Sequence, residues 1–200
     1  RRHSFPTRRS SDLVRLFTQG EKYFSEYGLY VDPAFLKIFS FPLLKGNIDE
    51  VLREPNTVLI SETLAKKYFG NEDPVGKTIT VEQTQQYKVQ GVLRDVPDNA
   101  TLSFDFLMPF KDYLQNSMGG NENWTTNNIR TYVKLKAGTD QAKLNTTVKN
   151  FMQQYTDQQV NTTLLLWNIK DWYLRFDFKN GVYAGGGRIT YVNKRKYFCW

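Results

Sequence analysis

Short strand-like segments alternate irregularly with a few helices along this chain, and no other feature of the sequence constrains its fold as strongly. The apolar run Val58–Ile60 precedes a helical pattern that extends to Phe69. Two strand patterns, Lys77–Val81 and Tyr87–Leu93, then follow, joined by the short polar connection Glu82–Gln86, which predicts a hairpin. A hairpin among irregularly spaced helices is typical of an α+β fold and not of a doubly wound βαβ series.

The helix after Val58–Ile60 has clear end signals. Ser61 is a good N-cap because its hydroxyl can accept a hydrogen bond from the first turn, and Gly70 is typical of a helix end. One face between them is apolar, which predicts that the helix buries this face; the face comprises Leu64, Ala65, Tyr68 and Phe69.

Two further regions each pair a strand with a helix. Tyr27–Val31 predicts a strand, after which Asp32 can cap a short helix that has Pro33 at its first position. This helix would place Phe35, Leu36 and Phe39 on one face. Leu102–Met108 alternates as a strand does, and Lys111–Met118 predicts a second short helix.

The longest helical pattern covers Thr139–Gln158, with Thr139 as its cap. Strand patterns at Ile129–Leu135 and Thr162–Trp167 flank it, so we expect a βαβ unit with two parallel strands in one sheet. The apolar stripe of the helix would pack on that sheet, and Phe151→Ala would cost about 3–5 kcal/mol. The stripe comprises Leu144, Val148, Phe151, Met152 and Tyr155.

The formal net charge of +7 lies almost entirely at the two ends. Residues 1–13 and residues 193–200 each carry a net charge of +3, which leaves +1 for the 179 residues between them. A nucleic-acid-binding surface needs clustered Lys and Arg in the folded part, so this class is excluded. Residues 1–13 resemble a translated sequencing adapter, and residues 193–200 break the preceding pattern. We expect two non-native tails that make few contacts with the rest.

Residues with catalytic or metal-binding chemistry are scarce. The only histidine and the only cysteine, His3 and Cys199, lie in the tails, which excludes a Ser-His-Asp triad, a cysteine nucleophile, a thiolate zinc site and a disulfide from residues 14–192. We therefore predict no catalytic, cofactor-binding or metal-binding residue, no cofactor, and a protein that is not an enzyme. The carboxylates expected to be solvated are Asp49, Glu50, Glu72, Asp73, Asp95, Asp98 and Asp105.

Gly70–Thr78 nearly matches the phosphate-binding loop of nucleotide-binding proteins. Five residues separate its two glycines where that loop has four. The segment also follows a helix and precedes a strand, which is the reverse of the required order. We expect a simple turn that binds no nucleotide.

The sequence also bears on membrane segments and loops. No apolar run approaches the roughly 18 residues that a membrane helix needs, and no apolar signal-peptide segment follows the N-terminal arginines. Gly119–Asn128 is polar and rich in Gly and Asn, which predicts a mobile loop.

Several segments form an ordered series over nearly all of residues 14–192. They are Tyr30–Phe39, Phe41–Gly46, Pro55–Glu62, Ala65–Gly70, Asp73–Lys77, Tyr87–Val92, Asp95–Pro97 and Gly186–Val192. Their order and spacing resemble the MacB-like periplasmic core domain of MacB/FtsX-type ABC transporter permeases.

The resemblance implies a domain on the periplasmic side of the cytoplasmic (inner) membrane, between two membrane helices of a permease. The permease would pair as a dimer, a cytoplasmic ABC ATPase would drive it, and periplasmic proteins are potential partners. The implied fold is α+β, with a porter-like α/β lobe and an inserted, more β-rich lobe at about residues 55–128. The implied role is to transmit ATP-driven conformational change for export or mechanotransmission.

Two other functions remain open at the level of sequence. A periplasmic module that binds a ligand or partner without transport coupling would need a concave apolar site. A carboxylate-based hydrolase would need two inward-facing carboxylates in one cleft.

Overall fold

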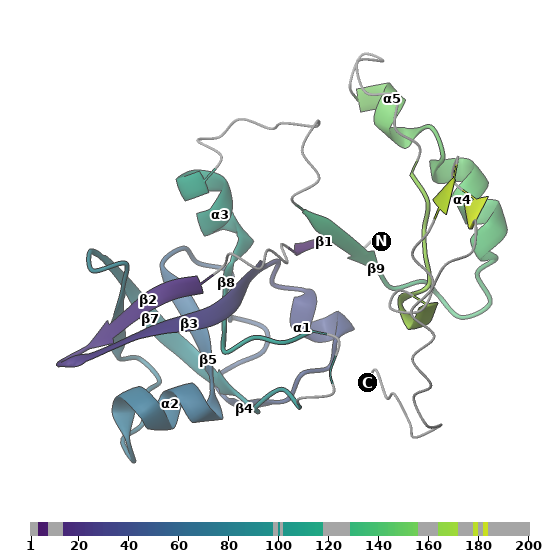
Figure 1. The fold of residues 1–200 in the computed structure, drawn as a ribbon. Helices are drawn as coiled ribbons and strands as arrows, with labels where there is room; N and C mark the ends of the chain where they lie inside the picture. The colour runs from purple at the N-terminus through teal and green to yellow at the C-terminus, as the bar shows by residue number, and fades with distance from the viewer. Residues whose placement is uncertain are drawn as a thin grey trace. The chain divides into compact units, whose positions relative to one another are not determined.

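The structure is a computed structural model that describes residues 4–7, 14–97, 100, 102–117, 129–155, 164–171, 178–179 and 182–183. The chain divides into two compact units, one up to Lys134 and one from Leu135 (Figure 1). The first unit contains β1 (Ser4–Thr7), β2 (Val14–Gln19), β3 (Lys22–Val31), α1 (Phe35–Ile38), β4 (Leu43–Lys45), β5 (Thr57–Ser61), α2 (Glu62–Phe69), β6 (Thr78–Val81), β7 (Gln85–Leu93), β8 (Phe106–Pro109), α3 (Phe110–Ser117) and β9 (Arg130–Val133). The second contains α4 (Gln141–Val148), α5 (Phe151–Tyr155), the 3-10 turn η1 (Ile169–Asp171), β10 (Phe178–Lys179) and β11 (Val182–Tyr183).

Six strands of the first unit close into a ring. β2, β6, β7, β5, β8 and β3 are neighbours in that order, and β2 also pairs with β3. The β3–β8 and β5–β7 pairs are parallel, and the other pairs of the ring are antiparallel. β4 pairs with β7, and β1 and β9 extend the sheet from β3. Closure gives the six strands a common interior.

Large apolar side chains fill this interior. Alternate residues of each strand point inward because successive side chains of a strand point to opposite faces. The core comprises Phe17, Tyr30, Val58, Ile60, Ile79, Val81, Tyr87, Val89, Val92, Phe106 and Met108 from the strands, Leu64, Tyr68 and Phe69 from α2, and Tyr113 from α3. The face of α2 that sequence predicts to be buried is therefore confirmed for these three residues.

A second, aromatic cluster lies around α1. Its ring centroids are 4.8–6.3 Å apart, a spacing typical of favourable aromatic contacts. The cluster joins α1 to the segments before β4, before β8 and in β9, and it comprises Phe35, Phe39, Phe41, Phe104 and Tyr132.

The α+β class and the predicted ends of α2 are confirmed. Ser61 Oγ accepts a hydrogen bond from the Leu64 N–H at 3.2 Å, and the helix ends before Gly70, whose φ is 65°. β6 and β7 form the predicted hairpin. Its turn contains Glu82 and Gln83 with positive φ angles of 52° and 63°.

The predicted start of α1 is wrong. The helix begins at Phe35, and Pro33 lies in the turn before it. Asp32 Oδ1 accepts a hydrogen bond from the Ala34 N–H at 2.9 Å, so Asp32 stabilises that turn instead of capping the helix.

The strand predicted at Leu102–Met108 is wrong in its first half, because β8 begins at Phe106. Leu102 and Phe104 are buried although they belong to no strand. Their burial comes from side-chain packing, which for Phe104 includes the rings of Phe35 and Phe41.

The expectation that residues 1–13 make few contacts is wrong for β1. All four of its residues pair with β9, from Ser4 opposite Val133 to Thr7 opposite Arg130. Thr7 also lies opposite Val31 of β3. For residues 193–200 the expectation stays a prediction, since they lie outside the described residues.

Residues 55–128, the expected inserted lobe, supply β5–β8 to the same ring as β2 and β3. The division into two compact units falls at Lys134 and Leu135, and the inserted lobe at about residues 55–128 stays a prediction. The loop predicted at Gly119–Asn128 and the last resembling segment, Gly186–Val192, lie outside the described residues.

The prediction of one helix over Thr139–Gln158 is wrong. α4 and α5 are separate helices with a turn at residues 149–150, and no residue of α4 is buried. Asp140 is the N-cap, accepting hydrogen bonds from the N–H groups of Ala142 and Lys143 at 2.9 and 3.2 Å. The Thr139 hydroxyl instead donates to the Lys136 carbonyl.

The predicted strand Thr162–Trp167 is wrong over residues 164–167, which belong to no strand; its first two residues lie outside the described ones. Side chains of α4 hold this segment. Asn145 accepts from the Leu166 N–H at 2.7 Å and donates to the Leu166 carbonyl at 3.3 Å, and Gln141 donates to the same carbonyl at 2.8 Å. The predicted βαβ unit is therefore not formed there. None of the described helices has the length and hydropathy to span a membrane.

Candidate functional site

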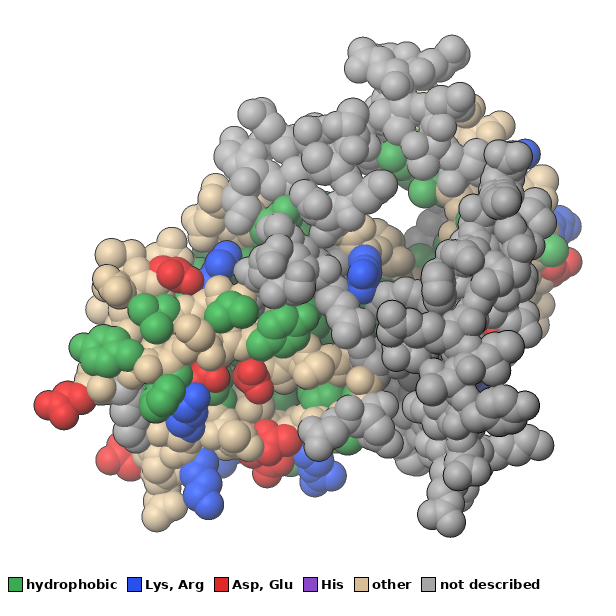
Figure 2. Space-filling view, viewed as in Figure 1, with side chains coloured by type: hydrophobic (Ala, Val, Ile, Leu, Met, Phe, Trp, Pro, Cys, Tyr) green, Lys and Arg blue, Asp and Glu red, His purple; other side chains and the backbone are tan. Residues whose placement is uncertain are grey.

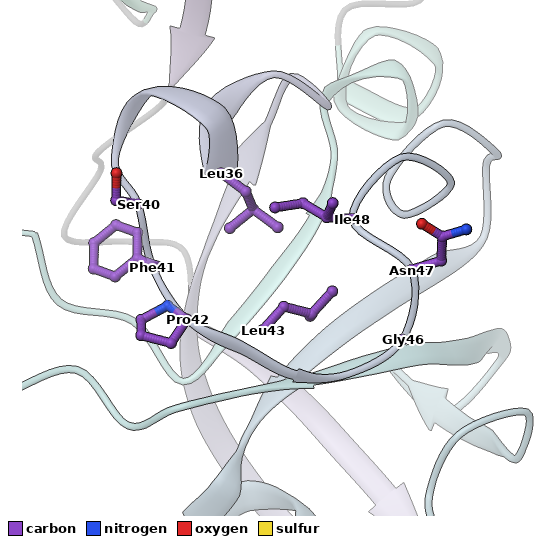
Figure 3. Close-up of a pocket in the computed structure, with 8 residues that line it drawn as sticks. All are labelled: Leu36, Ser40, Phe41, Pro42, Leu43, Gly46, Asn47 and Ile48. Atoms are coloured by element: carbon purple, nitrogen blue, oxygen red, sulfur yellow. The ribbon is translucent and has the colours of Figure 1, made fainter.

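The first unit has an open depression of about 630 Å³ beside α1 (Figure 3). Leu36 of α1, Leu43 of β4 and Ile48 of the following loop point toward its centre in Figure 3. Its other lining residues are Ser40, Phe41, Pro42, Gly46 and Asn47.

Close backbone contact positions the wall of this depression. A Cβ atom on Gly91 of β7 would lie 2.4 Å from the Lys45 carbonyl oxygen. Gly46 has a φ of 106°, in the left-handed region that favours glycine, and a Cβ there would lie 2.6 Å from the Gln90 carbonyl oxygen. Both glycines belong to the segments of the ordered series, so those segments allow the close antiparallel pairing of β4 with β7.

The depression is suited to apolar contact and not to chemistry. No residue that lines it is ionisable, and its polar side chains are Ser40 and Asn47 alone. Ile48 at its rim is 41% exposed. Such a surface can accept an apolar side chain of another molecule, but it offers no general acid, base or nucleophile.

Among the acidic residues that the structure describes in the first unit, Glu26 of β3 is the most buried after Asp112, at 6% exposed. Its Oε1 accepts hydrogen bonds from Lys67 Nζ at 2.6 Å and from the Tyr68 hydroxyl at 2.8 Å. Lys67 Nζ also lies 3.8 Å from the centroid of the Phe24 ring. Burial and the Glu26 hydrogen bond raise the pKa of Tyr68, so this hydroxyl stays protonated and donates.

Two aspartates bind backbone groups. Asp105 Oδ2 accepts from the Tyr27 N–H at 3.2 Å, and Asp112 accepts from the Asn56 N–H at 3.1 and 3.3 Å. Burial raises the pKa of both carboxyl groups, against the opposing effect of these N–H groups. Each therefore has a structural role, and the prediction that Asp105 is a solvated surface carboxylate is wrong.

Asp95 lies in the turn Asp95–Pro97 of the ordered series and is exposed, as predicted. Its carboxylate accepts from the Thr63 N–H at 3.0 Å and the Thr63 hydroxyl at 2.7 Å. Glu62 in turn accepts from the Asp95 N–H at 3.3 Å. This turn is thus a second cap on the N-terminus of α2.

The loop that resembles a phosphate-binding loop has the predicted conformation. α2 ends at Phe69 and β6 begins at Thr78, so the segment leaves a helix and enters a strand. The Gly76 N–H donates to the Val89 carbonyl at 2.8 Å, and the Lys77 ammonium pairs with Glu72, whose pKa it lowers. These donors are engaged within the protein.

Metal ligands are likewise not assembled. Within the described ranges, no group of three or more His, Cys, Asp or Glu side chains could hold a metal ion. The predicted pairs Asp49/Glu50 and Glu72/Asp73 are exposed, and Asp98 lies outside the described residues. Lys37 lowers the pKa of Asp49, while the Val75 N–H and Lys45 lower that of Asp73.

Glu26 and Asp112 were not predicted from the sequence as structural residues. The position of Glu26 gives a signal that could have been used. Along β3 it lies an even number of residues from Phe24 and Tyr30, so its side chain is on the same face of the strand as these two aromatic residues. Asp112 carries no comparable signal, because a carboxylate in the first turn of a helix is common on solvated helices too.

Comparison with known proteins gives a family and a fold. The family model of the MacB-like periplasmic core domain matches residues 4–151. Among curated proteins, none matches the chain.

The solved structures that are similar to the chain include the following three. A domain of a permease protein from Porphyromonas gingivalis has 28% identity and a TM-score of 0.64, covering 76% of this chain and 63% of its own. The periplasmic region of MacB from Actinobacillus actinomycetemcomitans has 19% identity and a TM-score of 0.59, covering 78% and 68%. The extracellular domain of the noncanonic ABC-type transporter YknZ from Gram-positive bacteria has 15% identity and a TM-score of 0.55, covering 81% and 80%. The present chain thus spans less than two thirds of the first of these structures.

Proposed function

The chain belongs to the MacB-like periplasmic core domain family, and we propose that it is the extracytoplasmic part of an ABC transporter permease that transmits ATP-driven conformational change. The family match over residues 4–151 carries this proposal. The similar fold of the Porphyromonas gingivalis permease domain supports it.

The proposed mechanism is mechanical. ATP binding to a cytoplasmic ATPase shifts the membrane helices of the permease, and this domain passes the shift to the periplasmic side. A transmitting domain needs rigid elements and defined contacts and no reacting group. Three carboxylates of the first unit fit this role, because Glu26, Asp105 and Asp112 each hold one element against another.

The proposed setting is the periplasmic side of the cytoplasmic membrane, in a permease dimer with a cytoplasmic ABC ATPase and, in some complexes, periplasmic partners. A cysteine introduced at exposed Lys88, in a Cys199→Ser background, tests the setting. In cells that express the complete permease, a membrane-impermeant maleimide is expected to label Lys88→Cys without lysis. Labelling only after lysis would place the domain in the cytoplasm and overturn the proposal.

The transmitting role is tested in the complete permease reconstituted with its ATPase. Replacing residues 14–192 by a flexible Gly/Ser linker is expected to leave ATP hydrolysis measurable and to abolish the ATP-dependent export or activation that the intact complex supports. Unchanged export from the linker variant would refute the transmitting role.

The depression beside α1 favours a second candidate, a module that binds a partner through apolar contacts without transport coupling. Ile48→Asp places a charge on its exposed rim and is expected to leave the fold intact. If the module hypothesis holds, this variant loses a periplasmic partner that copurifies with the wild type. Under the transmitting hypothesis, ATP-dependent export by the complete permease carrying this variant stays at the wild-type level.

A further inference from the structure

Two segments form the walls of the depression beside α1, and an ion pair joins them to each other. Residues 40–42 lie on one side of the opening in Figure 3, and residues 47 and 48 lie on the other. Lys37 belongs to α1, and its ammonium donates to the carboxylate of Asp49, the residue after Ile48, at 2.7 Å. This pair ties α1 to the segment that carries Ile48.

The segment that carries Ile48 is anchored although it belongs to no helix or strand. The Val51 N–H donates to the Asn47 carbonyl at 3.1 Å, which closes a turn. The Leu52 N–H donates to the side chain of Gln90 on β7 at 2.8 Å. The side chains of Val51 and Leu52 are both buried. Ile48 therefore projects from a turn that is fixed on the ring.

Three residues around the depression have backbone angles in the left-handed region. Ser40 and Gly46 line the depression with φ angles of 41° and 106°, and Leu52 follows the anchored turn with a φ of 64°. A bulky residue such as leucine rarely adopts this conformation, which persists only where the surrounding contacts impose it. Such positions are concentrated at sites that hold ligands. The backbone thus favours a preformed site over an incidental gap.

The charges beside the depression are matched within the protein. Lys37 pairs with Asp49, and Lys45 of β4 pairs with Asp73 at 3.2 Å. The residues that line the depression carry no charge. A charged side chain brought to this opening would lose its hydration and gain no counter-charge, which is unfavourable. Charge complementarity therefore favours a partner whose contacting residues are uncharged.

Size and polarity together favour a peptide side chain as the occupant. The volume of about 630 Å³ lies within the range of about 300–1,000 Å³ that ligand sites have. Leu36, Leu43 and Ile48 point toward its centre, so an apolar group placed there is removed from water. The Ser40 hydroxyl at the edge is exposed and can bond to a backbone amide beside a bound side chain. A lipid acyl chain has no amide for this hydroxyl.

We propose that the depression beside α1 is a preformed site for one leucine or phenylalanine side chain of a partner protein, presented by a peptide segment that is uncharged at the contact. The site rests on the second candidate function above, partner binding through apolar contacts, and specifies what the partner presents. An acyl chain and a second copy of this chain are the other occupants, and the experiment distinguishes them.

Two-dimensional amide NMR of the 200-residue chain tests the site with N-acetyl-leucine methylamide as the probe. This probe is expected to shift the amide signals of Ser40, Gly46 and Ile48 and to leave those of β6 unchanged. N-acetyl-glycine methylamide has the same backbone and buries no side chain, so it should bind at least about tenfold more weakly. 3-Methylbutan-1-ol has the branched carbon chain without the amides and should also bind more weakly. Binding by this alcohol as tight as that of the leucine probe would overturn the peptide assignment.

A matched pair of variants locates the binding. Ile48→Asp places a charge on the wall of the depression and should weaken binding of the leucine probe at least about tenfold. Figure 2 shows exposed hydrophobic side chains over the β2–β3 hairpin, where Val14 is 45% exposed, close to the 41% of Ile48. Val14→Asp is therefore the control and should bind the probe as the wild type does. The amide spectra also show whether each variant is folded.

Three results would overturn the site. The first is equal binding of the leucine and glycine probes to the wild type, a comparison that needs no variant. The second is wild-type binding by folded Ile48→Asp. The third is a shift of the Ser40 and Ile48 signals that grows with protein concentration alone, which would make a second copy the occupant. The probes act on the isolated chain, so these results are independent of whether a periplasmic partner copurifies with the complete permease.

Discussion

α2 and α4 are both eight residues long, and a side-chain oxygen caps each at its N-terminus, but they differ in what they bury. α2 places Leu64, Tyr68 and Phe69 in the core of the ring, whereas no residue of α4 is buried. α4 instead uses two amide side chains, Gln141 and Asn145, to hold a neighbouring extended segment. An apolar stripe therefore does not by itself place a helix in a core; α2 is in one because strands of the ring supply buried apolar side chains that its stripe packs against.

The largest expected difference between the two helices comes from a matched leucine truncation. Leu64→Ala in α2 should lower the free energy of unfolding by about 2–5 kcal/mol, because it leaves a cavity among fully buried side chains. Leu144→Ala in α4 should cost at most about 1 kcal/mol, since Leu144 is only half-buried. Urea denaturation followed by circular dichroism measures both. Equal losses would show that α4 belongs to a core as tight as that of α2.

The same comparison revises the expectation for Phe151. A continuous buried stripe would make Phe151→Ala cost about 3–5 kcal/mol. In the structure Phe151 begins the separate short helix α5 and is half-buried, so a smaller loss is expected. A loss as large as that of Leu64→Ala would contradict the division into two helices.

Two glycines should respond differently to substitution by alanine, because Gly28 of the ring is in close contact with its neighbours and Gly138 of the second unit has open space around it. A Cβ on Gly28 would lie 2.4 Å from the Phe106 ring, so Gly28→Ala should cost about 1–3 kcal/mol through overpacking. Gly138 has a φ of 78° and open space around it, so Gly138→Ala should cost about 1 kcal/mol from backbone strain alone. Differential scanning calorimetry of the two variants separates the cases. An unchanged unfolding temperature for Gly28→Ala would show that the Phe106 ring can shift to accommodate the added methyl group.

What the sequence predicts well is local, and what it misses depends on partners that are distant in the chain. The ends of α2 follow from Ser61 and Gly70, which act within one helical turn. The closure of β2 on both β3 and β6 joins Phe17 to Val81 across 64 residues, and no periodicity reports that pairing. The polar contacts also join residues that are distant in the sequence: Glu26 bonds to residues of α2, and Asn145 bonds to Leu166.

The break between α4 and α5 has the same cause. The apolar stripe continues through the break, but the Leu164 N–H donates to the Lys149 carbonyl at 3.2 Å. That bond uses a carbonyl at the end of α4 for a segment some fifteen residues further on. The local sequence pattern favours one continuous helix, but the structure has two helices, and a hydrogen bond from Leu164 is made at the point where they separate.

The N-caps of α2 and α4 should differ in their contribution to stability by a smaller amount. Ser61→Ala and Asp140→Ala each remove a cap that is typically worth about 0.5–2 kcal/mol. Ser61 is buried, so its loss leaves the Leu64 N–H without a partner or water, and the cost should lie near the upper end. Asp140 is exposed, and water can replace it, so the cost should lie near the lower end. Urea unfolding midpoints that reverse this order would contradict the difference in burial.

The smallest expected effect is the pH dependence of the ring, which arises from its buried carboxyl groups. Burial raises the pKa of Asp112 above its ordinary value of 3.8. The folded state therefore binds the proton more tightly than the unfolded state, and stability rises as the pH falls through the folded pKa toward 3.8. Above the folded pKa, this contribution is absent. Asp112→Asn stays neutral and can still accept from the Asn56 N–H, so it should flatten this rise.

Exposed Asp49 is the natural control for this effect, because Lys37 lowers its pKa. A lowered folded pKa stabilises the fold above 3.8 and loses that contribution as the pH falls through the folded value. Asp49→Asn should therefore shift the profile in the opposite direction and by less, since solvent and salt screen an exposed pair. Urea unfolding of the three proteins from about pH 2.5 to pH 8 covers the range below and above 3.8 in which both effects occur. If the free energy of unfolding rises more steeply toward acid in Asp112→Asn than in the wild type, the folded state lowers the pKa of Asp112, and the effect of burial given above is wrong.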